Sequence, residues 1–453
     1  MARSEGPVTA RSDQEHIGVI GGGMAGLTAA LRLVQAGHRV TLWEQAPLLG
    51  GQAVAFPVEG NRLEYFYHHL FQSDRDIVAL IDELGLSDDL LWLPSNVGYF
   101  ADGKIWPLNG ALDLLRLGFI PLHDRLRVGL VTAYLQRVKD WKPYERVTAH
   151  DWLRRALGAR AYERTLGAQL KAKFGRHERS VAMVWFWGKI WLRTTSRKSP
   201  LDQEKLGYPR GSFTTVIDAI AGAARALGAD LHVGVGPTAL RQEPDGRWAV
   251  VVPDGAVHCD RVIATVPSPV FQRLVPNLPA GYRAKLNTLQ YEAAMVVLLQ
   301  LDRKLSDIYW LNIADPSMPF TGIIEHTNFL PPSDYGGKHY VYLSKYLEAD
   351  DPLYQSSDDE VLAAYLPHLR KVNPSFQQEW IERLWVFRER AAQPIIPLHY
   401  SDSLPEHRTG LPGLYLANTT QIYPEDRGTN YSVRLGNRIA AMVDGDIRGR
   451  IDG

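Results

Sequence analysis

Three glycines near the start of the chain have the spacing of a phosphate-binding turn. Gly21, Gly23 and Gly26 fit the pattern G-x-G-x-x-G. In it, the first glycine permits a tight turn, the second lets the backbone approach a pyrophosphate, and the third lets a helix pack closely on a strand. Glu44 follows where a carboxylate can bind ribose hydroxyls. Because an acid rather than an arginine stands there, the pattern indicates a dinucleotide without a 2′-phosphate.

Two predicted strands and a helix hold these residues in place. Ile17–Ile20 is a short apolar run, typical of a central parallel strand. Apolar residues from Leu27 to Ala36 follow at helical spacing and stop at Gly37, and Val40–Glu44 forms the next strand. The helix N-terminus, with its free N–H groups, then faces the phosphates. The cofactor contacts expected from this unit are Gly21, Gly23, Met24, Ala25, Gly26, Glu44 and Gln45.

A second glycine pair, Gly50-Gly51, follows this unit. With the pattern from Gly21 to Glu44 it resembles the FAD-binding fingerprint of the flavoprotein amine oxidase superfamily. That superfamily includes protoporphyrinogen oxidases, phytoene desaturases and, more distantly, UDP-galactopyranose mutases. The resemblance implies FAD as the cofactor, with Gly51 and Gln52 near its pyrophosphate. An arginine commonly stands where this chain has Gln52, which can hydrogen-bond but cannot neutralise charge.

Two later segments resemble parts of the superfamily that return to the cofactor. In relatives, the segment aligned with 236–238 meets the adenine through its backbone, which implies a contact at Pro237, although proline has no N–H to offer. The chain end resembles the C-terminal flavin motif, in which a helix N-terminus points at the flavin and stabilises negative charge there. Asn418 stands where the motif usually has an acid, and it can donate to ribityl or phosphate oxygens. The flavin contacts implied for the helix are the backbone N–H groups of Asn430, Tyr431, Ser432 and Val433.

Two adjacent histidines, His68 and His69, are candidate catalytic residues. In an extended segment they face opposite ways, so one of them can reach the active site, and histidine transfers protons near neutral pH. The alternative is that both are hydrogen-bonded structural residues. In relatives this segment resembles an acid followed by small glycines that pass close to the flavin. Here Phe66 and Tyr67 replace those glycines after Glu64, so either the local backbone must differ or the flavin edge must be covered differently.

A length of 453 residues predicts more than one domain. The predicted fold class is α/β, with a Rossmann-like FAD-binding domain interleaved with an α+β substrate domain. Residues 1–14 are expected to form a loose polar tail. The FAD-binding domain is expected to comprise residues 15–91, 208–269 and 400–453, and the substrate domain residues 92–207, mainly helical, and 270–399, mainly antiparallel strands.

The composition argues against several classes of protein. Lys+Arg and Asp+Glu number 50 each, which disfavours a general polyanion binder, so no nucleic-acid partner is expected. The single cysteine, Cys259, excludes an internal disulfide and a CxxC metal site, and no metal is expected. The N-terminal residues lack the apolar region of a secretory signal, and no apolar run is long enough to span a bilayer. We therefore expect a cytoplasmic protein.

Two segments of the sequence each have two structural interpretations. Residues 111–141 are rich in leucine, arginine and lysine. They can form amphipathic basic helices that contact a membrane peripherally, as in some relatives, or helices packed on their neighbours with a solvated basic side. The aromatic cluster over 185–191 can line an apolar substrate channel or form a core seam between domains.

The resemblance implies an FAD-dependent oxidoreductase that transfers hydride from an apolar or cyclic small-molecule substrate to flavin N5. No lysine occurs between Leu286 and Asp302, where true amine oxidases carry an active-site lysine, and this disfavours amine oxidation. The alternative is a mutase, in which reduced flavin acts on a nucleotide-sugar without net redox. Its phosphates would then contact Arg193, Arg197 and Arg210. A third reading is a non-enzymatic scaffold stabilised by FAD.

Overall fold

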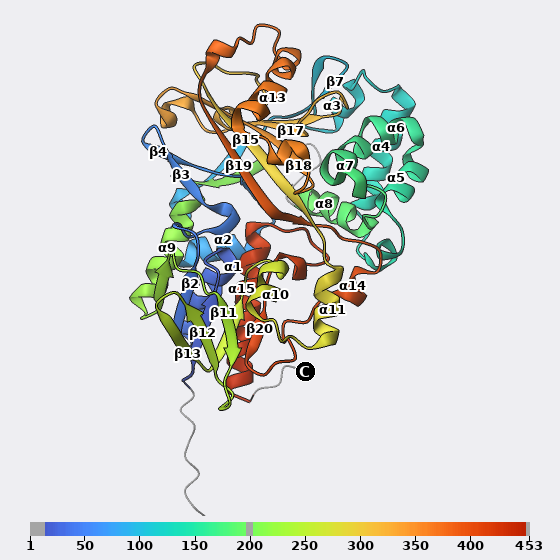
Figure 1. The fold of residues 1–453 in the computed structure, drawn as a ribbon. Coiled ribbons are helices and arrows are strands. Elements are labelled where there is room, and N and C mark those ends of the chain that lie inside the picture. Colours follow the sequence, from blue (N-terminus) through green and yellow to red (C-terminus); the bar gives the residue numbers. More distant parts are fainter. Residues whose placement is uncertain (1–13, 196–202, 450–453) are drawn as a thin grey trace, which may run out of the picture.

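The computed structural model describes residues 14–195 and 203–449. Figure 1 separates a lower half, built around a parallel sheet, from an upper half that holds a larger sheet with a group of helices beside it. The blue N-terminal and red C-terminal ribbons both lie in the lower half. Segments from the two ends of the chain therefore build one structural unit.

The lower half is organised around five parallel strands in the order β10-β2-β1-β14-β20. The central strand is buried from Ile17 to Ile20, as expected for a strand that is covered on both faces. Because parallel strands end at one edge of a sheet, the residues that follow them share that edge. The strands are β1 His16–Ile20, β2 Arg39–Glu44, β10 Asp230–Val233, β14 Arg261–Ala264 and β20 Leu414–Leu416.

Helices α1 Met24–Gln35, α9 Phe213–Ala226 and α15 Thr429–Ile447 pack together on this sheet. Gly436 allows α15 to lie close to α1, because a Cβ there would be 2.6 Å from the Ala25 carbonyl oxygen.

An antiparallel sheet of β11 Ala239–Gln242, β12 Trp248–Val252 and β13 Gly255–Cys259 adds a second core, which includes side chains of β1, β2 and β14.

The boundary expected at residue 269 differs from the packing. Helix α10 Ser268–Leu274 spans this boundary and α11 Ala280–Thr288 lies beyond it, yet Phe271 and Leu286 belong to the same core as Ile20. The apolar faces of these helices are thus buried against the lower half of the molecule, and the packing favours a domain boundary after α11.

The upper half contains a seven-stranded sheet in the order β19-β15-β18-β17-β16-β7-β8. Strand β15, which lies between β19 and β18, is buried on both faces because almost all of its residues are apolar. Helix α13 Asp358–Val372 begins at a capping box of Ser357 and Glu360 and packs into this core. The strands are β7 Val97–Ala101, β8 Lys104–Pro107, β15 Tyr291–Leu301, β16 Trp310–Ile313, β17 Gly322–Glu325, β18 His339–Leu347 and β19 Ile381–Pro394.

The helical group lies beside this sheet (Figure 1). The sequence pattern over 161–174 predicts one helix, but the structure has two, which meet at Thr165, where the hydroxyl donates to the Ala161 carbonyl (2.5 Å). Trp185 and Trp187 are buried in the core of this group, which favours the core interpretation of the aromatic cluster. The helices are α3 Ala111–Arg116, α4 Leu122–Leu135, α5 Ala149–Leu157, α6 Ala159–Arg164, α7 Leu166–Phe174 and α8 Met183–Thr195.

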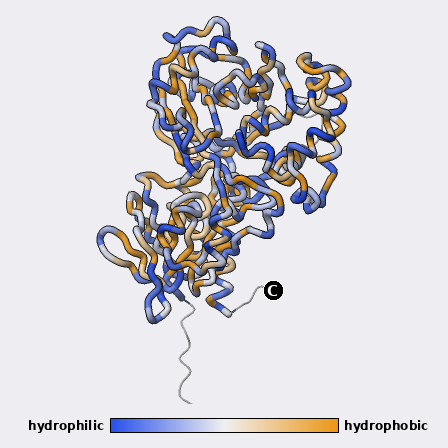
Figure 2. Tube along the Cα trace, turned by 45° about the vertical axis from the view of Figure 1, so that its right-hand side comes forward, coloured by the Kyte–Doolittle hydropathy of each residue, from blue (hydrophilic) through white to orange (hydrophobic). Residues whose placement is uncertain are grey.

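Short elements connect the two halves. Figure 2 shows apolar and polar stretches alternating through both. The connecting strands are β3 Ala55–Val58, β4 Asn61–Glu64, β5 Leu70–Phe71, β6 Leu90–Pro94 and β9 Lys205–Pro209. Of the remaining short helices, α2 Arg75–Glu83 packs on α15, α12 Pro352–Gln355 packs into the core of the upper sheet, and α14 Tyr400–Ser403 joins the core of the helical group. The arrangement confirms the α/β class with a Rossmann-like unit interleaved with an α+β unit.

Among the described residues, no helix combines the length and apolarity needed to cross a bilayer.

Candidate functional site

The glycine turn lies at the carboxyl end of β1 and is tightly packed. A Cβ on Gly26 would lie 2.0 Å from the Gly21 carbonyl oxygen, and a Cβ on Gly21 would lie 2.5 Å from the Thr265 hydroxyl. Gly21 also has φ +109°, a conformation that favours glycine. These two positions require glycine for the packing of the turn itself.

Gly23 differs, because a Cβ there would meet nothing nearer than the Gly51 Cα at 3.8 Å. It precedes α1, whose first turn has no acidic residue and no side-chain cap. The N–H groups of Met24, Ala25 and Gly26 have no acceptor within the helix. An open approach to free N–H donors at a helix N-terminus fits the pyrophosphate of a dinucleotide.

Glu44 ends β2 beside this turn. Its carboxylate accepts hydrogen bonds from the Gly22 and Ala46 N–H groups, at 2.7 and 2.8 Å, and it is half-buried. Gln45 packs on Gly236, where a Cβ would lie 2.9 Å from the Gln45 side chain. The structure therefore brings Glu44, Gln45 and the neighbour of Pro237 to one edge, where a ribose and a base would follow the pyrophosphate.

The second glycine pair lies against the first turn. The Gly50 N–H donates to the Gly22 carbonyl at 2.8 Å, and Gly51 adopts φ +56°. The Gln52 amide donates to the Ala391 carbonyl of β19 at 3.1 Å. Gln52 thus links the pyrophosphate edge to the upper sheet, and its place near the cofactor remains a prediction.

Asn418 follows β20 and does not have the side-chain role expected for it. Its amide N–H groups donate to the Val266 carbonyl at 3.0 Å and to the Ser268 hydroxyl at 3.1 Å. Its amide oxygen accepts from the N–H and hydroxyl groups of Thr420. Because both amide hydrogens are used within the protein, the side chain has no donor left for ribityl or phosphate oxygens, and it fixes the loop instead.

Helix α15 begins at Gly428, so the free N–H groups of its first turn belong to Thr429, Asn430 and Tyr431. The Ser432 N–H already donates to the Gly428 carbonyl at 2.9 Å. Val433 is one residue deeper in the helix, and its side chain is fully buried in the core. Of the four expected flavin contacts, Asn430 and Tyr431 thus have N–H groups in the open first turn, whereas Ser432 and Val433 do not, and the contact itself remains a prediction. The Asn430 side chain caps α2 through the Asp76 N–H.

The two candidate histidines both lie in partly buried surroundings. His68 Nδ1 donates to the Phe66 carbonyl at 2.5 Å, and burial lowers the pKa of His68 to about 4, with Arg427 adding to the effect. His69 Nδ1 lies 3.2 Å from the Tyr309 hydroxyl. His68 is therefore neutral near neutral pH and can accept a proton but cannot supply one.

Glu64 anchors the start of the same segment. Its carboxylate is fully buried and accepts from the Tyr208 hydroxyl at 2.8 Å and the Phe213 N–H at 2.8 Å. Burial raises the pKa of Glu64 to about 7. The Tyr342 hydroxyl donates to the Glu64 carbonyl. Glu64 thus ties the segment before His68 to α9 and to the upper sheet.

A group of charged residues that sequence reasoning missed lies where α7, α8, β18 and the loop before α15 meet. Lys189 forms an ion pair with Asp426, and Arg427 donates to the Tyr346 hydroxyl at 3.1 Å. Lys173 lies over the Tyr346 ring, 4.6 Å from its centroid. In the sequence these residues look like ordinary surface charges, because more than two hundred residues separate the helices from the loop.

The arginines considered for phosphate binding are not part of this group. Arg210 is exposed and pairs with Asp89 at 3.6 Å. Arg197 lies outside the described residues, and so does the side chain of Arg193.

Strand β15, which spans the region where true amine oxidases carry an active-site lysine, has no lysine.

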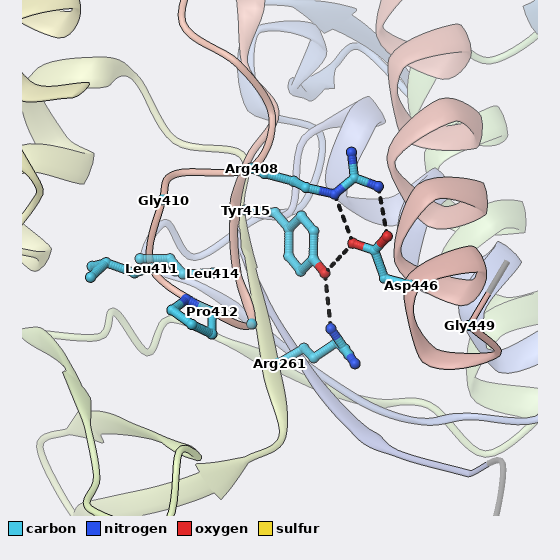
Figure 3. Close-up of a pocket in the computed structure, with 10 residues that line it drawn as sticks. Arg261, Arg408, Gly410, Leu411, Pro412, Leu414, Tyr415, Asp446 and Gly449 are labelled. Carbon is cyan, nitrogen blue, oxygen red and sulfur yellow. Dashed lines mark hydrogen bonds and ion pairs between the residues drawn. The ribbon is translucent and has the colours of Figure 1, made fainter. Parts of the chain in front are cut away.

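A surface pocket of about 400 Å³ lies at the opposite edge of the parallel sheet, where β14 and β20 begin (Figure 3). Its charged residues bond to one another: Arg408 donates to Asp446 at 2.6 Å, and Arg261 donates to the Tyr415 hydroxyl at 3.0 Å. Because it lies away from the carboxyl ends of the strands, it is not the nucleotide site.

The described residues include one cluster with metal-ligand chemistry, although no metal was expected. Candidate ligand atoms of His177, Glu292 and Glu348 lie within 4.8 Å of one another. Arg176 contacts the Glu348 carboxylate at 2.9 Å. The Arg176 guanidinium is thus a cation that the protein itself places at this cluster.

Comparisons with known proteins agree with this geometry. Residues 24–425 match the family of flavin-containing amine oxidoreductases. A phytoene dehydrogenase of Streptomyces griseus is 26% identical over 302 residues, which cover 60% of this chain and 58% of that protein. The match thus spans less than two thirds of that relative.

Two solved structures show the same fold. A protein described as a putative protoporphyrinogen oxidase from Exiguobacterium superposes with a TM-score of 0.76 at 16% identity, over 95% of this chain and 99% of that chain. A reduced UDP-galactopyranose mutase superposes with a TM-score of 0.72 at 15% identity, over 96% and 97%.

Proposed function

This chain belongs to the family of flavin-containing amine oxidoreductases, and we propose that it is an FAD-dependent dehydrogenase of a largely apolar small molecule. The observation that carries the proposal is the open glycine turn at Gly23, which fits a pyrophosphate, in a chain that matches this family over residues 24–425. FAD, when bound, accepts a hydride at N5 and passes the electrons on to oxygen or another acceptor.

The residues of the chain bind and orient the cofactor. The N–H groups of Met24 to Gly26 hold its pyrophosphate, and Glu44 holds a ribose. The N-terminus of α15 lies at the end of the chain's last loop, where its positive dipole end stabilises developing negative charge. The aromatic residues around Tyr67 and Trp310, which pack edge to face at 5.0 Å, help to exclude water above this edge.

Dehydrogenation is favoured over amine oxidation by β15. This strand is apolar except for Glu292 and Gln300, and it carries no lysine that could serve a flavin in the manner of true amine oxidases. The Streptomyces relative is described as a phytoene dehydrogenase, which supports an apolar substrate. The mutase remains the second candidate, because the fold of a reduced UDP-galactopyranose mutase covers 96% of this chain.

Anaerobic flavin bleaching tests the proposal. The purified holoprotein is mixed without oxygen with isoprenoid and tetrapyrrole compounds, and the flavin absorbance is followed. We expect bleaching by at least one apolar compound and none by UDP-sugars. Binding of UDP-sugars to the dithionite-reduced protein, with no bleaching by the apolar set, would replace dehydrogenation by the mutase reaction.

The histidines are tested with the same assay. We expect replacement of both His68 and His69 by alanine to slow bleaching if either one accepts a proton from the substrate. An unchanged rate in the double variant, with the flavin retained, would make both residues structural.

We also propose that residues 111–141 contact a membrane from the cytoplasmic side. Helix α4 exposes Leu122, Leu126, Leu130 and Tyr134, which recur every fourth residue and so form one stripe. Leu130 is 72% exposed. Exposed arginines such as Arg116 lie close by in the sequence. An apolar stripe beside cationic groups fits an anionic bilayer surface, from which an apolar substrate would enter.

A further inference from the structure

The charged group near the start of α15 contains three cations and one carboxylate. Lys173 comes from α7, Lys189 from α8, and Asp426 with Arg427 from the loop that leads into α15. The loop and α8 touch, since a Cβ on Gly188 would lie 3.4 Å from the Pro424 carbonyl oxygen. We call these four residues the cationic cluster.

The single carboxylate of the cluster is already fully engaged. Asp426 Oδ1 accepts from the Trp185 indole N–H and from the Gln393 amide, both at 3.0 Å. Its other oxygen pairs with Lys189. The Asp426 side chain is only 6% exposed. Its charge is thus matched by Lys189, and two cations remain.

Lys173 and Arg427 have neutral partners. The Lys173 ammonium lies 4.6 Å from the Tyr346 ring centroid and 5.2 Å from that of Trp185. Arg427 donates to the Gln393 amide oxygen and the Tyr346 hydroxyl, each at 3.1 Å. Among residues 14–195 and 203–449, no carboxylate lies within ion-pair distance of either cation. Asp426 is thus the one carboxylate whose charge acts on both of these partly buried cations, and it also pairs with Lys189. Three cations that share one carboxylate favour an anion that arrives with a ligand.

The electrostatics of the neighbouring groups agree with an excess of positive charge. Burial lowers the pKa of Lys173 to about 8. Burial alone would raise the pKa of Tyr346, but Lys173 and Arg427 lower it to about 8. Arg427 also contributes to the low pKa of His68, which places the predicted catalytic segment in the field of the cluster.

The cations can be reached by a ligand. The Lys189 side chain is 40% exposed, and Lys173 and Arg427 are half-buried rather than sealed. Arg427 directly precedes Gly428, the N-cap of α15, so the cluster lies next to the helix end assigned to the flavin. The pyrophosphate edge at Gly23 belongs to a different helix, α1.

We propose that Lys173, Lys189 and Arg427 form an anion subsite, which binds a carboxylate or phosphate group carried by an otherwise apolar substrate. The inference rests on the proposed dehydrogenase function and deepens it, since it makes the substrate amphiphilic. Trp185 and Tyr346 offer aromatic faces beside the cations for the adjoining apolar part.

Isothermal titration calorimetry of the holoprotein with decanoate, decyl phosphate and decanol tests the subsite. We expect one of the two anions to bind at least about tenfold more tightly than decanol near neutral pH, the effect of one charge-assisted hydrogen bond. The tighter of the two identifies the anion as a carboxylate or a phosphate. Equal affinity for decanol and both anions would overturn the proposal.

The variant Lys173→Met removes a cation without breaking an ion pair. We expect it to lose most of the preference for the anion, Lys173→Arg to keep it, and Lys171→Met, on an exposed position of the same helix, to behave as wild type. An undiminished preference in Lys173→Met would overturn the proposal.

FAD content is measured in the same samples. A colourless protein that still prefers the anion would contradict the proposed function and leave the subsite intact. A flavin-loaded protein without the preference would contradict the anion subsite and leave the proposed function intact.

Discussion

At the scale of single residues, the glycines of the first turn serve two different purposes. Gly21 and Gly26 are required by the packing of the turn, because a Cβ at either would collide with protein atoms. Gly23 has extended backbone, with φ −74° and ψ 175°, and open space where its side chain would point. Its lack of a side chain matters for the ligand and not for the fold.

This difference yields a sharp prediction for Gly23→Ala. We expect the melting temperature of the flavin-free protein to be unchanged and FAD affinity to fall at least about tenfold, since the new methyl displaces phosphate from charge-assisted N–H donors. Equilibrium dialysis with FAD measures the affinity. Gly222→Ala, in open space on α9, is the control and should retain FAD. Full FAD affinity in Gly23→Ala would place the pyrophosphate elsewhere.

A second residue-scale prediction concerns pH. Lys173 is protonated below its pKa of about 8 and neutral above it, and Tyr346 becomes an anion as pH rises through about 8. The other charged groups that face them are Lys189, Arg427 and Asp426. Decanoate affinity should therefore be full below about pH 8 and decrease above it. Titrations at several pH values measure this, and a profile as flat as that of Lys173→Met would contradict it.

At the scale of elements, periodic patterns predicted the helices well. The sequence pattern over 361–372 predicts a helix, which is present as α13, and the helix predicted at the chain end is present as α15. The break at Thr165 was missed because the apolar spacing continues across it, whereas the Thr165 hydroxyl bonds back to Ala161. Asn418 was assigned to the cofactor from its motif, but its bonds to Val266 and Ser268 come from a loop 150 residues away.

At the scale of elements, the testable prediction concerns the exposed apolar stripe of helix α4. Replacing Leu126 and Leu130 by serine should leave stability unchanged, because both side chains are exposed. It should weaken binding to vesicles that contain phosphatidylglycerol by at least about tenfold, since each buried leucine contributes about 1.5–3 kcal/mol. Cosedimentation measures the binding. Leu227→Ser, an exposed leucine after α9, is the control. Equal binding of the double variant and wild type would rule out this contact.

At the scale of the whole molecule, the site is assembled from the two ends and the middle of the chain. The turn at Gly21, the segment before Pro237 and the start of α15 come together only through the strand order β10-β2-β1-β14-β20. The sequence motifs indicated these parts separately. The cationic cluster was not predictable, because its charges acquire a shared role only when α7, α8 and the last loop meet.

A ligand that contacts all three segments should stabilise the whole fold. We expect FAD at about one hundred times its dissociation constant to add about 2.7 kcal/mol to the free energy of unfolding of flavin-stripped protein. Riboflavin, which lacks the pyrophosphate and adenine, should add much less. Differential scanning calorimetry measures both, and equal stabilisation by riboflavin would argue against the role assigned to Gly23 and Glu44.

The identity of the bound cofactor tests the central claim most directly. The protein is purified, its visible spectrum recorded, and any flavin released by denaturation is identified by chromatography. The account predicts a yellow protein that releases FAD in equimolar amount. A colourless protein that also fails to retain FAD after incubation and gel filtration would contradict it.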